Sequence, residues 1–96
     1  MSPLNKKKLN SLRVKLDKLD NELLKLIKDR SNLVNEVLKV KSKKKEIIDQ
    51  KRINLILKKI KKKSIKLKVD PKITNRIWKN MIWSFIDYEK RNFKKK

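Results

Sequence analysis

The strongest constraint on the fold is a run of aliphatic residues spaced alternately three and four apart over 9–40. The series is Leu9, Leu12, Leu16, Leu19, Leu23, Leu26, Arg30, Leu33, Val37 and Val40. This spacing is the heptad repeat of a helix that packs along one stripe, and no Pro or Gly interrupts it. We predict a helix over 9–41, started near Asn10 or Ser11 and roughly 50 Å long. Because a 96-residue chain cannot bury such a stripe, the helix needs a partner, most simply a second copy.

Two shorter helices are predicted after a polar break at 42–46. The segment 48–63 carries an apolar stripe at helical spacing, made of Ile53, Ile56, Leu57 and Ile60. A third helix is predicted over 70–93, because Asp70 suits the N-cap and Pro71 the first helical position. Its inner face combines Trp78, Ile82, Phe85 and Glu89, with Met81 and Ile86 beside it. The sequence therefore predicts an all-α chain with three helices in one domain over 1–96.

The composition excludes several kinds of enzyme. The chain has no Cys, His or Gly, which removes disulfides, thiolate nucleophiles, imidazole chemistry and Gly-rich phosphate loops. No metal site is expected. No apolar run approaches the roughly 18–20 residues that span a bilayer, and no signal peptide is visible. We therefore expect a cytoplasmic protein with no membrane partner.

The net charge of +21 raises the question of nucleic-acid binding. Lys is spread over every segment and accompanied by many Ile and Asn, and the aromatic residues are not interleaved with the basic runs as a stacking surface requires. A solvated Lys-rich surface is the preferred interpretation, and nucleic acid is an unlikely partner. Arg is scarce by comparison, and only Arg offers a planar fork that matches a carboxylate. The five are Arg13, Arg30, Arg52, Arg76 and Arg91.

Two charged residues occupy apolar stripes. Arg30 takes one place in the heptad series, either as a polar residue that sets the register or snorkels, or as a buried guanidinium that binds an anion. Glu89 follows Phe85 by one turn on the inner face of the third helix. It either points to water at the helix end or is a desolvated carboxylic acid that keeps its proton and donates a hydrogen bond.

Helix geometry relates three of the cations. Arg30 and Lys41 lie on one face of an ideal helix, about 20° apart in azimuth and roughly 16 Å apart along the axis. Arg13 is about 42 Å from Lys41 along the same axis and cannot serve their site in its own chain. In an antiparallel pair centred near residue 25, Arg13 of the partner chain falls between them. Such a cluster from two chains suits a small dicarboxylate.

These residues carry a family resemblance. The segment 12–30 follows the pattern LRxxIDxxDxxLLxLLxxR, with Lys41 eleven residues after Arg30. Further matches are Ile48-Asp49-Gln50-Lys51-Arg52, then Asp70-Pro71 ahead of Ile77-Trp78. Together they resemble the all-helical, type II chorismate mutases over residues 9–90. The resemblance implies an intertwined homodimer with two composite active sites that converts chorismate to prephenate. This pericyclic reaction of phenylalanine and tyrosine biosynthesis needs no cofactor.

The resemblance also implies a role for each site residue. Arg30 and Arg13 of the partner chain would bind substrate carboxylates, and Lys41 would donate to the ether oxygen. Arg52 would line the carboxylate side, and Asp49 would orient the substrate hydroxyl. Glu89, where the family has Gln or Glu, would be protonated and donate beside Lys41.

Two positions depart from the family pattern. Ile53 stands where the family usually has Glu, and Phe85 where it often has Ser. The related isochorismate-pyruvate lyases share the fold and also carry an apolar residue at the first position. The lyase reaction is therefore an alternative on the same fold. A basic helical dimer that binds nucleic acid is the alternative outside enzymes.

Overall fold

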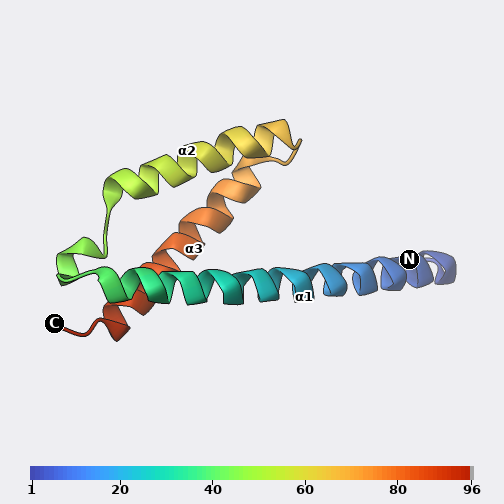
Figure 1. Cartoon of the computed structure of the whole chain (residues 1–96). Coiled ribbons are helices and arrows are strands. Elements are labelled where there is room, and N and C mark those ends of the chain that lie inside the picture. Colours follow the sequence, from blue (N-terminus) through green and yellow to red (C-terminus); the bar gives the residue numbers. More distant parts are fainter. Residues whose placement is uncertain (96) are drawn as a thin grey trace. The chain divides into compact units, whose positions relative to one another are not determined.

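The computed structural model describes residues 1–95, and helices dominate it (Figure 1). In chain order these are α1 (Pro3–Val40), the short 3-10 helix η1 (Lys44–Glu46), α2 (Gln50–Lys66) and α3 (Pro71–Asn92), and no strand occurs among the described residues. The predicted all-α class, with one long N-terminal helix and two shorter helices, is confirmed. The chain divides into two compact units, Met1–Leu33 and Val34–Lys96. None of the helices in the described part is long and apolar enough to cross a membrane.

The helix predicted to begin at residue 9 begins instead at Pro3. Ser2 precedes it, and the Ser2 hydroxyl accepts a hydrogen bond from the backbone N–H of Asn5 at 3.1 Å. Ser caps the free N–H groups of a helix start, and Pro at the first helical position has no N–H to satisfy. The heptad series marks only the apolar stripe, so it missed the polar turns that precede Leu9.

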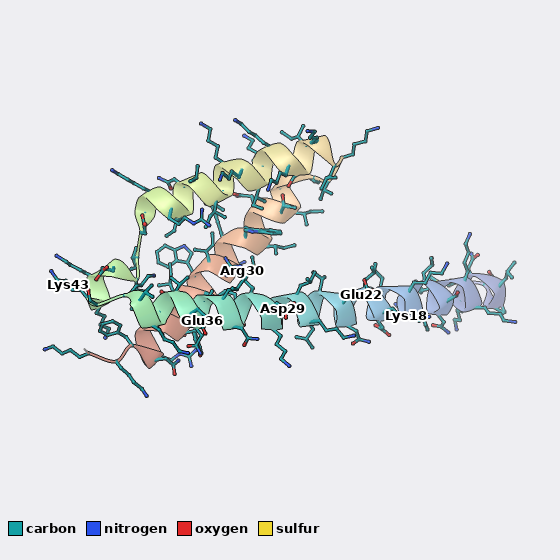
Figure 2. The ribbon with its side chains drawn as sticks, viewed as in Figure 1. Lys18, Glu22, Asp29, Arg30, Glu36 and Lys43 are labelled. Atoms are coloured by element: carbon teal, nitrogen blue, oxygen red, sulfur yellow. The ribbon has the colours of Figure 1, made fainter. Side chains whose placement is uncertain are left out.

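The first unit leaves its apolar stripe open to solvent. Leu9 is half-buried, whereas six later leucines of the series are exposed, with relative exposures from 47% at Leu12 to 66% at Leu33. These six are Leu12, Leu16, Leu19, Leu23, Leu26 and Leu33. Polar side chains such as Lys18, Glu22 and Asp29 project around the same helix (Figure 2). One continuous exposed apolar stripe of this kind marks an interaction surface.

In the second unit, α2 and α3 are antiparallel neighbours, joined by the turn at 67–70 (Figure 1). Both starts are capped by Asp. The Asp49 carboxylate accepts from the Arg52 N–H at 3.0 Å, and the Asp70 carboxylate accepts from the Lys72 N–H at 2.9 Å. The predicted Asp70–Pro71 start signal is confirmed, and α2 starts two residues later and ends three residues later than the predicted range 48–63.

The core of the second unit is small and aliphatic. It consists of Leu38, Ile47, Ile53, Ile82 and Ile86, with Ile56, Leu57 and Phe93 packed against it. The stripes predicted on 48–63 and 70–93 both contribute to it. Ser64 is also buried, and its hydroxyl lies 2.7 Å from the Thr74 hydroxyl and 2.6 Å from the Ile60 carbonyl oxygen. This polar contact ties α2 to α3 without an unsatisfied buried group.

The end of α2 places a lysine in a conformation that favours glycine. Lys68 has a φ of 60°, its N–H donates to the Ile65 carbonyl, and the Val69 N–H donates to the Ser64 carbonyl. This pair of bonds is a Schellman motif, whose left-handed residue is usually Gly because a Cβ is strained there. The chain contains no Gly, so a Lys bears the strain.

We predict that Lys68→Gly stabilises the chain by about 0.5–1 kcal/mol, because relief of left-handed strain exceeds the added entropy of the unfolded chain. Urea denaturation followed by circular dichroism measures the change. The matched control is Lys66→Gly, inside the last turn of α2, which should destabilise by about 1 kcal/mol. A loss of stability in Lys68→Gly would contradict the strain argument.

Candidate active site

An ion pair joins Lys41, the residue after the end of α1, to Glu89 of α3. The Lys41 ammonium donates to Glu89 Oε2 at 3.0 Å. The Lys41 side chain is 18% exposed and that of Glu89 only 8%. Glu89 lies one helical turn from Ile86 and two turns from Ile82, and both belong to the core. Of the two interpretations of Glu89 that the sequence left open, the structure supports the buried one.

This pair fixes a hydrogen-bond donor in a partly dry environment. An ammonium group has three donors, so the bond to Glu89 leaves two for a ligand. A donor held in place before the reaction costs no reorganisation when charge develops on a ligand oxygen. Glu89 acts as acceptor in this geometry. Its predicted role as a protonated donor stays a prediction.

A cavity of about 450 Å³ opens beside Lys41. Its walls come from the loop after α1 and the start of α2, namely Lys41, Glu46, Ile48, Asp49, Gln50 and Lys51. The volume falls in the range of small-molecule sites. The structure therefore brings two of the predicted site residues, Lys41 and Asp49, to one cavity.

Asp49 and Arg52 lie next to each other at the start of α2. Both are exposed, and one Asp49 oxygen already accepts the Arg52 backbone N–H as the helix cap. The cap fixes the position of the Asp49 carboxylate at the cavity wall. Arg52, in the first turn of α2, is exposed, so an anion can reach its guanidinium from solvent.

The two departures from the family pattern have different surroundings. Ile53 is 6% exposed and belongs to the core, so it packs rather than faces the cavity beside Lys41. A carboxylate at this buried position would need a partner. Phe85 is half-buried on α3, one turn before Glu89.

Arg13 and Arg30 belong to the first unit. Arg13 is exposed, and Arg30 is half-buried on the apolar stripe of α1 (Figure 2). Their participation in a site with Lys41 stays a prediction.

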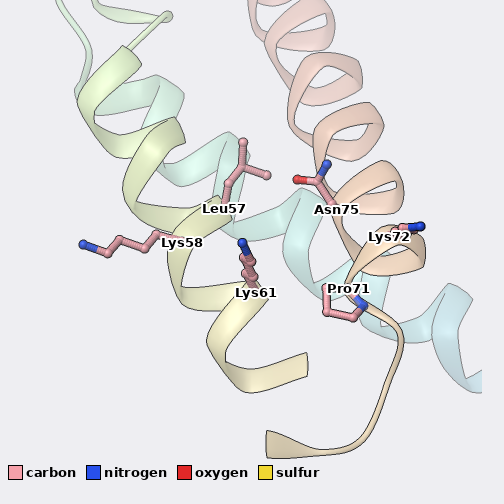
Figure 3. Close-up of a pocket in the computed structure, with 6 residues that line it drawn as sticks. All are labelled: Leu57, Lys58, Lys61, Pro71, Lys72 and Asn75. Atoms are coloured by element: carbon pink, nitrogen blue, oxygen red, sulfur yellow. The ribbon is translucent and has the colours of Figure 1, made fainter. Parts of the chain in front are cut away.

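A second cavity, of about 470 Å³, lies between α2 and α3 and contains none of the predicted site residues (Figure 3). It is lined by Leu57, Lys58, Lys61, Pro71, Lys72 and Asn75. Asn75 points toward α2, whereas Lys58 and Lys72 point away from each other. Because this second cavity contains none of the predicted site residues, the cavity beside Lys41 is the better candidate for the site.

Comparison with protein-family models shows which family this chain belongs to. The model of the type II chorismate mutases matches residues 12–90, most of the chain. The chain belongs to the type II chorismate mutase family. Searches of curated proteins and of solved structures gave no significant match. Among the described residues of this type II chorismate mutase family member, no group of three or more acidic side chains is placed to hold a metal ion.

Glu46 lines the cavity but was not predicted from the sequence as a site residue. Glu46 was assigned to a polar break, yet it lines the cavity with Lys41 and bonds the loop backbone. No capping-box pattern marks Glu46 in the sequence, because the residue three positions earlier is Lys43, whose ammonium group cannot accept a backbone N–H.

Loss of one partner of the buried pair should destabilise the fold. We predict that Glu89→Ala lowers the free energy of unfolding by about 2–3 kcal/mol, because the Lys41 ammonium is left largely desolvated and unpaired. Urea denaturation at a fixed protein concentration measures it. The control is Asp87→Ala, which removes an ion pair with Arg91 whose side chains are 68% and 65% exposed. That change should cost less than about 0.5 kcal/mol. If the free energy of unfolding falls equally in the two variants, the buried Lys41–Glu89 pair contributes no more to stability than an exposed pair does.

Proposed function

We propose that this chain is a chorismate mutase that converts chorismate to prephenate in phenylalanine and tyrosine biosynthesis. The observation that carries the proposal is the Lys41–Glu89 pair at 3.0 Å beside a cavity, in a chain of the type II chorismate mutase family. The activity is known here at the level of the family, and its assignment to this chain is the proposal.

The proposed chemistry fits a chain without nucleophiles. In the rearrangement one carbon–oxygen bond of the ether breaks while one carbon–carbon bond forms, so atoms and electrons balance within one molecule. Negative charge grows on the ether oxygen in the transition state. Lys41 would donate to that oxygen, and Glu89 would hold the ammonium in place. The protein has only to bind the folded substrate and stabilise this charge.

The proposed substrate site is shared between two chains. Arg30 and Arg13 of the partner chain would bind the carboxylates of chorismate. Arg52 and Asp49 would line the side that carries the ring carboxylate and hydroxyl, and Phe85 would pack against the ring. The exposed leucines of α1 support the dimer, because a second copy of this helix would cover them.

One observation favours a second reaction. Ile53 is packed in the core, so the position that usually holds a Glu carries no polar group. Isochorismate-pyruvate lyase, on the same fold, is therefore the second candidate.

An assay of the purified protein on both substrates tests the proposal. We expect prephenate from chorismate. Lys41→Ala should lower the turnover rate by roughly 10²–10³-fold, since one donor to a developing oxyanion is worth that much. Arg76→Ala, which changes an exposed arginine outside the proposed site, should leave turnover unchanged.

Two outcomes would contradict the proposal. Pyruvate from isochorismate with no prephenate from chorismate would assign the lyase reaction. Equal turnover by the wild type and Lys41→Ala would trace the activity to another protein in the preparation, or remove Lys41 from the chemistry.

A further inference from the structure

The loop that follows Lys41 is organised by one carboxylate. Glu46 Oε1 accepts the backbone N–H of Lys43 at 2.7 Å and the hydroxyl of Ser42 at 3.0 Å. The backbone closes the same turn, because the Glu46 N–H donates to the Lys43 carbonyl at 3.0 Å. These bonds lower the pKa of Glu46 below its ordinary value of 4.5, the Lys43 backbone bond contributing most and the Ser42 hydroxyl next.

The loop needs such an organiser because its sequence supplies no other. It contains no Gly or Pro, and Lys43, Lys44 and Lys45 repel one another. Lys43 has extended backbone angles, φ −126° and ψ 139°, where the chain leaves the helical direction. The Glu46 carboxylate bonds the backbone at this change of direction.

The organised loop connects two fixed points. On one side is Lys41, whose N–H donates to the Leu38 carbonyl at 3.2 Å and whose ammonium bonds Glu89. On the other side is Ile47, only 3% exposed in the core. The conformation of 42–46 therefore sets where the Lys41 backbone lies relative to Glu89 and the cavity.

We propose that Glu46 is a positioning residue for Lys41. It holds the loop through Ser42 and Lys43, and the loop holds the Lys41 ammonium against Glu89 at the cavity. The catalytic consequence rests on the proposed function, in which Lys41 is the donor to the substrate. Glu46 itself acts through the loop and does not need to touch the substrate.

Kinetics give the first test. Glu46→Ala should lower the turnover rate about 10–100-fold with a smaller change in KM, because small misplacement of a catalytic group costs rates of this order. Glu46→Gln keeps an acceptor for both donors and should restore part of the rate, since a neutral acceptor makes a weaker bond. The matched control is Glu36→Ala, which removes an exposed carboxylate paired only with Lys39 and should leave turnover unchanged.

Chemical labelling gives the second test, which does not depend on activity. Acetylation by a small anhydride, followed by mass spectrometry, reports the reactivity of each lysine. Lys41 should react slowly in the wild type, because it is 18% exposed and paired, while Lys39, 67% exposed, serves as the internal reference. Glu46→Ala should raise the Lys41 rate several-fold relative to Lys39.

The outcomes separate the two proposals. Slower turnover together with faster Lys41 acetylation supports the positioning role. An unchanged Lys41 acetylation rate in Glu46→Ala overturns it, whatever happens to turnover. If the wild type does not convert chorismate, the proposed function fails while acetylation still decides the placement of Lys41. If circular dichroism shows that Glu46→Ala does not fold, Ser42→Ala, which removes one of the two bonds, must shift acetylation in the same direction or the proposal fails.

Discussion

The exposed leucine stripe of α1 constrains both the stability of this chain and the proposed assembly of its site. The chain buries only a few aliphatic side chains in its core, while the leucines from Leu12 to Leu33 lie in solvent. A free energy of folding built on so small a core is marginal, and an apolar stripe of this length is a liability unless it is covered. A second copy of the chain would cover it. In the proposed dimer the same contact that stabilises the fold would bring Arg13 to the site of the partner chain.

The second unit buries an ion pair, Lys41–Glu89, in addition to its aliphatic core. Glu89 shares one face of α3 with the core residues Ile82 and Ile86 and pairs there with Lys41, although a pair of apolar residues in place of the two charged ones would often be at least as stable. Such a pair is expected at a site that needs a fixed cation rather than at one that needs only stability. The sequence contains no His, Cys or Gly. Their absence is consistent with the proposed pericyclic reaction, which needs a fixed charge and no nucleophile.

The sequence predicted the parts of the fold that depend on repeating patterns. The Asp70–Pro71 start followed from local capping chemistry. Helical spacing put Glu89 on the inner face of α3 but left open whether its side chain points to water, and the structure shows it buried. The start of α1 at Pro3 was not predicted, because the turns before Leu9 are polar and lie outside the apolar repeat. Lys68 in a left-handed turn and Glu46 in its loop depend on backbone geometry at positions where no Gly or Pro marks a turn. The spacing of residues in the sequence does not show which lysine adopts the strained left-handed conformation.

The proposed sites are built from two chains each, and mixing of subunits tests this proposal. Arg13→Ala and Lys41→Ala proteins are prepared separately, each expected to be nearly inactive, and are then mixed under conditions that allow chains to exchange. Half of the dimers then carry one chain of each kind, and each of these has one intact site and one doubly altered site. The mixture should therefore recover about a quarter of the wild-type activity. A mixture no more active than its two components would contradict it, because Arg13 and Lys41 would then not meet across two chains.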